Sequence, residues 1–153
     1  MDKKGLTLIE LLIVIAIIGI LAMIAIPGYV GQQRNAARTE AHSNLQNLRL
    51  LLEQYYAENA CYYMTGGPPP VCTNVANLTG VANIQTFLPG FRPTDLATDP
   101  TEERLHFSYS ITTNSTGPGG GTASYAIATA TGKAGKRVPG EVFTIDSNNA
   151  RNF

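Results

Sequence analysis

A single carboxylate stands inside the most apolar stretch of this 153-residue chain. Glu10 lies between Leu6 and Ile26, where Thr7 is the only other polar side chain. A charge within an apolar helix of membrane length is costly to bury and marks a functional site by default. The carboxylate must therefore either reach the membrane interface or form an ion pair with a cation.

Composition argues against several other classes of site. The chain carries 11 Lys and Arg against 11 Asp and Glu, so its formal net charge is zero, which disfavours a strongly basic nucleic-acid binder. Only two cysteines are present, with no Cys-x-x-Cys pair, so multi-cysteine zinc sites, iron–sulfur clusters and attached haem are disfavoured. His42 and His106 belong to no nucleophile or metal motif. We predict no catalytic site, no cofactor and no metal.

The apolar stretch has the length of a membrane span. As a helix, Leu6 to Ile26 would extend roughly 30 Å, the thickness of a bilayer's hydrocarbon core. Lys3 and Lys4 precede it, so the positive-inside rule predicts a cytoplasmic amino terminus and an external remainder. The stretch is longer than that of a cleaved secretory signal. A simple membrane anchor would explain the length but not Glu10.

The start of the chain resembles the processing site of type IV prepilins. A short basic leader ends at Gly5, hydrophobic Leu6 follows, and Glu10 is the fifth residue after the leader. The resemblance implies cleavage between Gly5 and Leu6 by a prepilin peptidase, which also methylates the new amino group of Leu6. Gly19 and Pro27 stand where such chains commonly carry Gly and Pro. The short leader is similar to that of the type IVa subclass.

The same resemblance implies an assembly role for Glu10 and Pro27. The amino group released at Leu6 is a cation near neutral pH, and in a growing filament it would meet Glu10 of a neighbouring copy. Such a pair would neutralise the buried carboxylate and set the register of the incoming subunit. Removing one partner of a buried pair typically costs about 3–5 kcal/mol. The alternative is that the Glu10 side chain extends to the membrane interface and forms no such pair.

We predict an α+β fold in which a long helix precedes a small antiparallel sheet. The predicted segments are a leader (1–5), a membrane-spanning and assembly half of the helix (6–31), its amphipathic half (32–60) and an extracytoplasmic head (61–153). Apolar residues spaced by three or four predict one buried helix face: Ala37, Ala41, Leu45, Leu48, Leu52 and Tyr55. Pro27 predicts a kink or local melting of the helix.

The head is predicted to be a long loop followed by the sheet. Residues 61–104 are rich in Asn, Thr, Gly and Pro, which favours a loop. Alternation predicts strands at 105–112, 123–131 and 142–146, with Tyr125 and Ile127 facing the core. A meander of three or four strands would cover the apolar helix face. This order of elements is similar to the pilin fold.

Cys61 and Cys72 both fall in the external part of the chain, an oxidising setting. A bridge between them would close a loop of about a dozen residues and contribute roughly 3 kcal/mol. Two free thiols are the alternative. Type IVa pilins often place a disulfide near the carboxyl end, but no cysteine follows Cys72. We therefore transfer no adhesion role associated with that bridge.

Two charged clusters in the head are candidate ligand-binding sites. Asp99, Glu102 and Glu103 could hold calcium or form a solvated loop; the Asp-Pro-Trp-Gly stretch of calcium-binding pseudopilins is missing, since the chain has no Trp. The second cluster is basic and is made by Lys133, Lys136 and Arg137. It could contact DNA phosphates, although the aromatic residues typical of single-strand binding are absent there. A solvated loop or a subunit contact is the alternative.

These features predict a non-enzymatic structural protein. We expect a type IV pilin-like subunit, held in the bacterial inner membrane and then polymerised through its apolar helix into a surface filament. Such filaments serve adhesion, motility or DNA uptake. The implied partners are copies of the chain, the prepilin peptidase, and the pilus assembly platform with its ATPases. A type II secretion pseudopilin or a minor pilin is the nearest alternative, and a membrane-tethered DNA-binding module is the alternative from another class.

Overall fold

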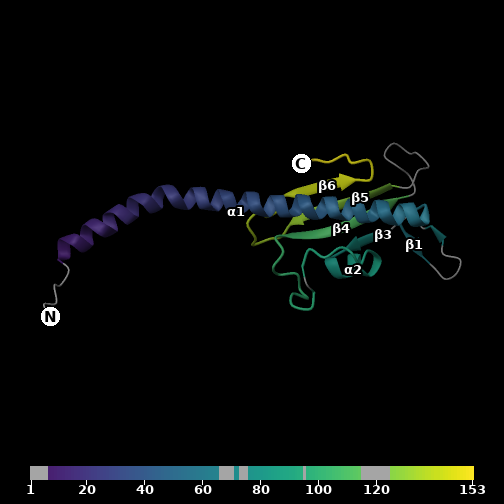
Figure 1. Ribbon diagram of the computed structural model, residues 1–153, viewed down its shortest axis with the longest axis horizontal. Helices are drawn as coiled ribbons and strands as arrows, with labels where there is room; N and C mark the ends of the chain where they lie inside the picture. The colour runs from purple at the N-terminus through teal and green to yellow at the C-terminus, as the bar shows by residue number, and fades with distance from the viewer. Residues whose placement is uncertain (1–6, 66–70, 73–75, 95, 115–124) are drawn as a thin grey trace. The chain divides into compact units, whose positions relative to one another are not determined.

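The computed structural model describes residues 7–65, 71–72, 76–94, 96–114 and 125–153 (Figure 1). In chain order its elements are α1 (Leu8–Asn59), β1 (Met64–Thr65), β2 (Val71–Cys72), β3 (Ala76–Thr79), α2 (Val81–Phe87), β4 (Phe107–Asn114), β5 (Tyr125–Gly132) and β6 (Val142–Asp146). The chain divides into two compact units, residues 1–36 and 37–153. The arrangement of a long apolar helix before an antiparallel sheet confirms the predicted α+β fold.

The first unit contains the apolar start of α1. Large apolar side chains are exposed on every side of it, with Ile17 at 52% and Met23 at 77% exposure. The most apolar 18-residue window of α1 has a mean hydropathy of 3.1, and none of that window is buried by the chain. By length and composition this helix can cross a membrane. A helix that is apolar all round needs lipid or other protein to cover it.

Pro27 lies inside α1 and does not interrupt it. The backbone stays helical through Pro27, Gly28 and Gly31, so the predicted local melting is wrong. Proline removes one backbone hydrogen bond and crowds one carbonyl, and the intact turns on either side can hold the helix together across that defect. The kink expected at the same position stays a prediction.

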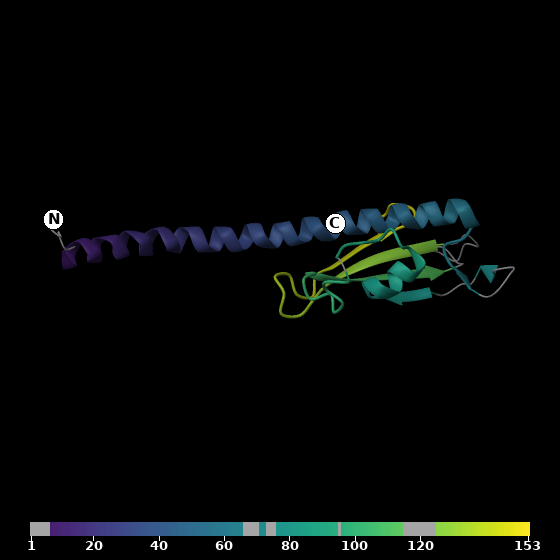
Figure 2. The ribbon, with the colours of Figure 1, turned by 60° about the horizontal axis from the view of Figure 1, so that its bottom comes forward.

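The second unit is built on a four-stranded antiparallel sheet in the order β3-β4-β5-β6. A single row of paired residues crosses it: Leu78 pairs with Ile111, Ile111 with Ala128, and Ala128 with Ile145. The part of α1 that belongs to this unit runs along one face of the sheet (Figure 2). A separate two-stranded ladder joins β1 to β2.

The core lies between this helix and the sheet. The helix contributes Ala37, Ala41, Leu45, Leu48 and Leu52, which are buried as the spacing predicted, while Tyr55 is partly buried against them. The sheet contributes Phe107, Tyr109 and Ile111 of β4 with Ala126, Ala128 and Ala130 of β5. Large side chains on β4 and small ones on β5 let the helix pack closely on the sheet.

Two features of the head differ from the sequence prediction. In β5 the alanines face the core, whereas Tyr125 and Ile127 are only partly buried, so the predicted face of this strand is wrong. A strand offers its faces in strict alternation, and here the small residues fit beneath the helix.

The predicted loop 61–104 is also wrong, because it contains β1, β2, β3 and α2. α2 buries Val81 and Ile84 in the same core, and Leu88 and Phe91 follow it there. Four apolar residues within a segment rich in turn formers give too short a periodic signal to predict a helix.

Candidate assembly site and head surface

Thr7 and Glu10 cap the start of α1. Oε2 of Glu10 accepts hydrogen bonds from the backbone N–H of Thr7 at 2.8 Å and from its hydroxyl at 2.7 Å. In return, the backbone N–H of Glu10 donates to Oγ1 of Thr7 at 3.3 Å. This reciprocal pattern is a capping box, with Thr7 as the N-cap and Glu10 as the third helical residue. It satisfies two N–H groups at the helix start and places a carboxylate near the positive end of the helix dipole.

The capping box is a role of Glu10 that the sequence analysis missed. Its signal was present, since a Thr followed three residues later by Glu before an apolar run is a helix-start signature. No ion pair of Glu10 occurs among the described residues of the chain. Gly5 and Leu6 lie outside the described residues, so the predicted cleavage and methylation site stays a prediction.

Pro27 and the nearby glycines are exposed on α1. A side-chain carbon added at Gly19, Gly28 or Gly31 would meet nothing within 4 Å in this chain. The fold of a single described chain therefore does not require glycine at these positions. A partner that approaches the helix backbone would require it.

Cys61 and the strand that carries Cys72 lie near each other in the chain trace. Cys61 follows the end of α1 and is buried, at 3% exposure. The ladder between β1 and β2 pairs the backbone of Cys72 with Met64, which lies three residues after Cys61. The backbone thus returns Cys72 to the neighbourhood of Cys61. The bond between the two sulfur atoms stays a prediction.

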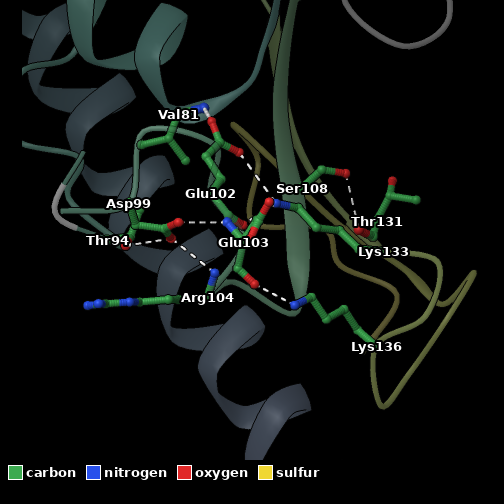
Figure 3. A network of polar contacts seen from close by, with 10 residues as sticks. All are labelled: Val81, Thr94, Asp99, Glu102, Glu103, Arg104, Ser108, Thr131, Lys133 and Lys136. Carbon is green, nitrogen blue, oxygen red and sulfur yellow. Dashed lines mark hydrogen bonds and ion pairs between the residues drawn. The ribbon is translucent and has the colours of Figure 1, made fainter. Parts of the chain in front are cut away.

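The acidic loop before β4 is held by hydrogen bonds to its own backbone (Figure 3). Asp99 accepts from the N–H of Glu103 at 2.8 Å, the N–H of Arg104 at 3.0 Å and the hydroxyl of Thr94 at 3.3 Å. Burial raises the pKa of Asp99, but the hydrogen bonds from Arg104, Glu103 and Thr94 outweigh burial and leave its pKa lowered. Asp99 is 4% exposed and is therefore not a solvated acid.

Two lysines of the basic cluster bind this loop from the turn after β5. Nζ of Lys133 donates to the carbonyl of Glu102 at 2.5 Å and lies 3.7 Å from the Glu102 carboxylate. That carboxylate also accepts the N–H of Val81 at the start of α2, at 2.5 Å. Nζ of Lys136 donates to the carbonyl of Glu103. The two ammonium groups thus bind oxygen atoms that would otherwise be available as ligands of a metal cation (Figure 3).

The predicted basic cluster is therefore divided by the fold. Lys133 has a carboxylate partner, Lys136 has a neutral carbonyl partner, and Arg137 is exposed. For the Arg137 side chain no hydrogen bond or ion pair is found within the described ranges. The predicted contact of this cluster with DNA stays a prediction.

His42 packs against aromatic rings, and His106 lies near a carboxylate. The ring of His42 stacks on Phe153 with ring centres 4.2 Å apart and meets the edge of Phe143 at 4.7 Å. Burial, helped by the charge of Arg38, lowers the pKa of His42. His106 lies with Nδ1 3.8 Å from the Glu40 carboxylate. Among the described residues no group of three His, Cys, Asp or Glu is placed to hold a metal ion.

One family model and several known proteins match part of the chain. Residues 1–26 match the family described as the prokaryotic N-terminal methylation motif. The type IV major pilin protein PilA of Myxococcus xanthus is 46% identical over 60 residues, which is 39% of this chain and 27% of PilA. The type II secretion system core protein G of Pectobacterium carotovorum is 35% identical over 63 residues, 41% of this chain and 40% of that protein.

A further match covers a larger share of the chain. The type IV major pilin protein PilE1 of Neisseria gonorrhoeae is 35% identical over 78 residues, 51% of this chain and 36% of PilE1. The matched part thus spans between 27% and 40% of the length of these three relatives. No solved structure matches the chain significantly.

Proposed function

We propose that this chain, which matches the N-terminal methylation motif and shares part of its sequence with type IV major pilins, is a structural subunit of a type IV pilus-like filament. The observation that carries the proposal is the first unit of α1, whose large apolar side chains are exposed on every side. Nothing in the described part of the chain covers them. Lipid covers this segment before assembly, and the same segments of other copies cover it in the filament.

Cohesion of the filament comes from packing of these helices against one another. Full burial of one aliphatic side chain away from water is worth about 1.5–3 kcal/mol, so exposing the helix to solvent is prohibitive. Inside the bilayer, lipid already keeps these apolar side chains away from water. Close contact between helix backbones then favours association. The unobstructed glycines Gly19, Gly28 and Gly31 suit such close contact.

Glu10 aligns neighbouring subunits in this proposal. Cleavage after Gly5 releases a cationic amino group at Leu6, and this group pairs with Glu10 of a neighbouring copy. The capping box supports the proposal, because both bonds from Thr7 go to Oε2. A carboxylate accepts about four hydrogen bonds, so Oε1 can receive the incoming amine while the helix cap stays closed.

The remaining assignments follow from the same role. The chain is non-enzymatic, its amino terminus faces the cytoplasm and its head lies outside the inner membrane until assembly carries it to the cell surface. Residues 1–5 form the leader, and 6–31, 32–60 and 61–153 act as assembly helix, amphipathic helix and head. Cys61 and Cys72 form a disulfide in the head. The prepilin peptidase, the assembly platform and its ATPases are the partners.

Mass spectrometry of the mature amino terminus tests the proposal. In cells that hold a prepilin peptidase we expect a chain that begins at Leu6 and carries a methyl group on its amino nitrogen. A peptidase-deficient strain should retain Met1 to Gly5. An intact amino terminus in the presence of the peptidase, or cleavage beyond Pro27, would contradict the proposal.

A type II secretion pseudopilin is the second candidate, favoured by the match to secretion system core protein G. A minor pilin at the tip of a filament is the other alternative. Purified surface filaments distinguish these roles. A major subunit dominates the mass of such filaments, whereas a minor pilin is a trace component and a pseudopilin is absent from them.

A membrane-tethered DNA-binding module is the candidate from another class, and Arg137 is the exposed cation that would support it. The test replaces Lys133, Lys136 and Arg137 together by glutamine in the full chain and measures DNA binding over a salt series. Phosphate contacts predict binding that weakens with salt and is lost in the variant. Equal binding by both proteins would dispose of this candidate.

A further inference from the structure

The turn between β5 and β6 forms a cavity of about 420 Å³ on the head. Its described lining is His106, Gly135, Lys136 and Arg137, a set that contains two permanent cations and no acid. Nδ1 of His106 is buried and has no hydrogen-bond partner among the described residues. The cavity therefore offers positive charge and hydrogen-bond donors in a concave space, which is the chemistry that recognises a phosphate group.

The two cations of this cavity keep their charge available. Lys136 donates to a backbone carbonyl, which orients its ammonium group without neutralising it. Arg137 has no contact within the described residues that would neutralise it. Two of the acids nearby are engaged, since Glu102 faces Lys133 and Glu141 faces Arg38. Glu103, whose carbonyl accepts from Lys136, is exposed and stays close to that cation. Glu40, 3.8 Å from Nδ1 of His106, opposes an anion at the histidine, as Glu103 does at Lys136.

The turn that carries the cavity is built before any ligand arrives. Its backbone is closed by the N–H of Gly132 on the carbonyl of Glu141 at 2.8 Å and by the N–H of Gly140 on Gly132 at 3.0 Å. The N–H of Lys133 binds the carbonyl of His106 at 2.9 Å. A ligand would therefore meet cations that are already positioned, which lowers the entropic cost of binding.

The same turn lies beside the first residues of the head's helix. Arg38 donates to both oxygens of Glu141, from Nε at 2.9 Å and from Nη2 at 2.6 Å, and so ties the end of the turn to that helix. Residue 38 follows the proposed membrane segment, which ends at residue 31, by at most about 10 Å of helix. Chain connectivity alone therefore keeps the cavity within reach of the lipid headgroups while the subunit is anchored.

We propose that this cavity binds the phosphate of an anionic phospholipid headgroup and holds the head on the membrane surface before assembly. The inference rests on the proposed membrane-anchored state. A lipid phosphate and a free phosphate share the same recognition chemistry, but the tether favours the lipid because it keeps the headgroups at high local concentration. Cations at a membrane surface each contribute about five-fold to the binding of anionic lipid.

The test uses the full chain in lipid nanodiscs and follows amide hydrogen exchange of residues 133–141. One set of discs contains phosphatidylcholine alone, and the other contains phosphatidylcholine mixed with phosphatidylglycerol. We expect exchange at the turn to be slower in the anionic discs at low salt, by about five-fold. High salt should remove the difference, because the contact is electrostatic.

Matched variants separate binding from stability. Arg137→Gln removes a cation that forms no hydrogen bond or ion pair within the described residues, and it should abolish most of the difference between the discs. Arg92→Gln removes an exposed arginine outside the cavity, and the difference should persist. Glu40→Gln should enlarge the difference, because it removes an opposing acid. A turn that was merely ordered by its own contacts would not respond to Glu40 in this way.

Three outcomes would overturn the inference. One is equal exchange in the two kinds of disc. Another is the same slowing when inorganic phosphate is added to zwitterionic discs, which would assign the cavity to a free anion. A third is slowing by a DNA duplex alone, which would assign it to nucleic acid. Each can occur with correct cleavage after Gly5, so the proposed filament role would survive, whereas failure of the chain to enter discs would contradict that role itself.

Discussion

The carboxylate of Glu10 accepts both the backbone N–H and the hydroxyl of Thr7, at 2.8 Å and 2.7 Å, and so completes the capping box at the start of α1. A carboxylate predicted to reach the membrane interface or to pair with a cation is thus hydrogen-bonded within its own chain. The cap orients Glu10 at the very start of α1, where the proposed pairing with the amino group of a neighbouring copy would take place.

Three variants separate the cap from the charge. Glu10→Ala removes both and should leave processing largely intact while blocking filament formation. Glu10→Gln keeps an oxygen that can accept from Thr7 but loses the charge, so filaments should again fail. Thr7→Ala loses the cap alone, at a cost of about 1 kcal/mol in helix stability, and filaments should persist. Mass spectrometry reports processing and electron microscopy reports filaments; normal filaments from Glu10→Gln would refute the proposed ion pair.

Gly132 should be intolerant of a side chain. A carbon added there would lie 1.9 Å from the backbone carbonyl oxygen of Val138, so the turn would have to move. We expect Gly132→Ala to destabilise the head by about 1–3 kcal/mol, the usual cost of overpacking. Thermal unfolding of the full chain in detergent measures this.

Gly135→Ala is the matched control for Gly132→Ala. Gly135 has a φ of +75° but open space around it, so only backbone strain opposes the substitution. That strain costs about 1–2 kcal/mol. A larger loss at Gly135 than at Gly132 would show that the close contact with Val138 does not constrain the turn.

The head should become less stable as the pH falls below 6.5, because of His42. Its pKa lies below the ordinary 6.5, chiefly through burial, so the unfolded chain takes up a proton more readily. Stability is therefore complete above pH 6.5 and falls as the pH drops toward the lowered pKa. Asp99 adds a second loss only below its ordinary pKa of 3.8. Urea unfolding at several pH values should show the first loss in the native chain and not in His42→Leu.

Reduction should weaken the head if Cys61 and Cys72 are bridged. Closing a loop of about a dozen residues is worth roughly 3 kcal/mol, and a reducing agent would remove that amount from the free energy of unfolding. The double variant Cys61→Ser, Cys72→Ser should behave like the reduced protein and no longer respond to the reductant. Alkylation of both thiols in the native, unreduced protein would contradict the bridge.

Much of the architecture could be predicted from apolar residues that repeat every few positions along the chain. The spacing of Ala37, Ala41, Leu45, Leu48 and Leu52 and the alternation of Leu105, Phe107, Tyr109 and Ile111 each identify a buried face, because helix and strand repeat with fixed periods. The Thr7-x-x-Glu10 cap was equally local and could have been predicted. Elements as short as α2 were not predictable, since two turns of helix carry too few apolar residues to establish a period.

The sequence by itself determined the long apolar helix, its isolated carboxylate and the buried faces of α1 and β4, because these depend on neighbours a few residues apart. Only the tertiary structure decided which residues of β5 face the core, and that Lys133 and Lys136 bind a loop about 30 residues earlier while Arg137 remains exposed. Those outcomes depend on how side-chain volumes and charges meet across the fold. Such meetings between distant segments leave no periodic trace in the chain.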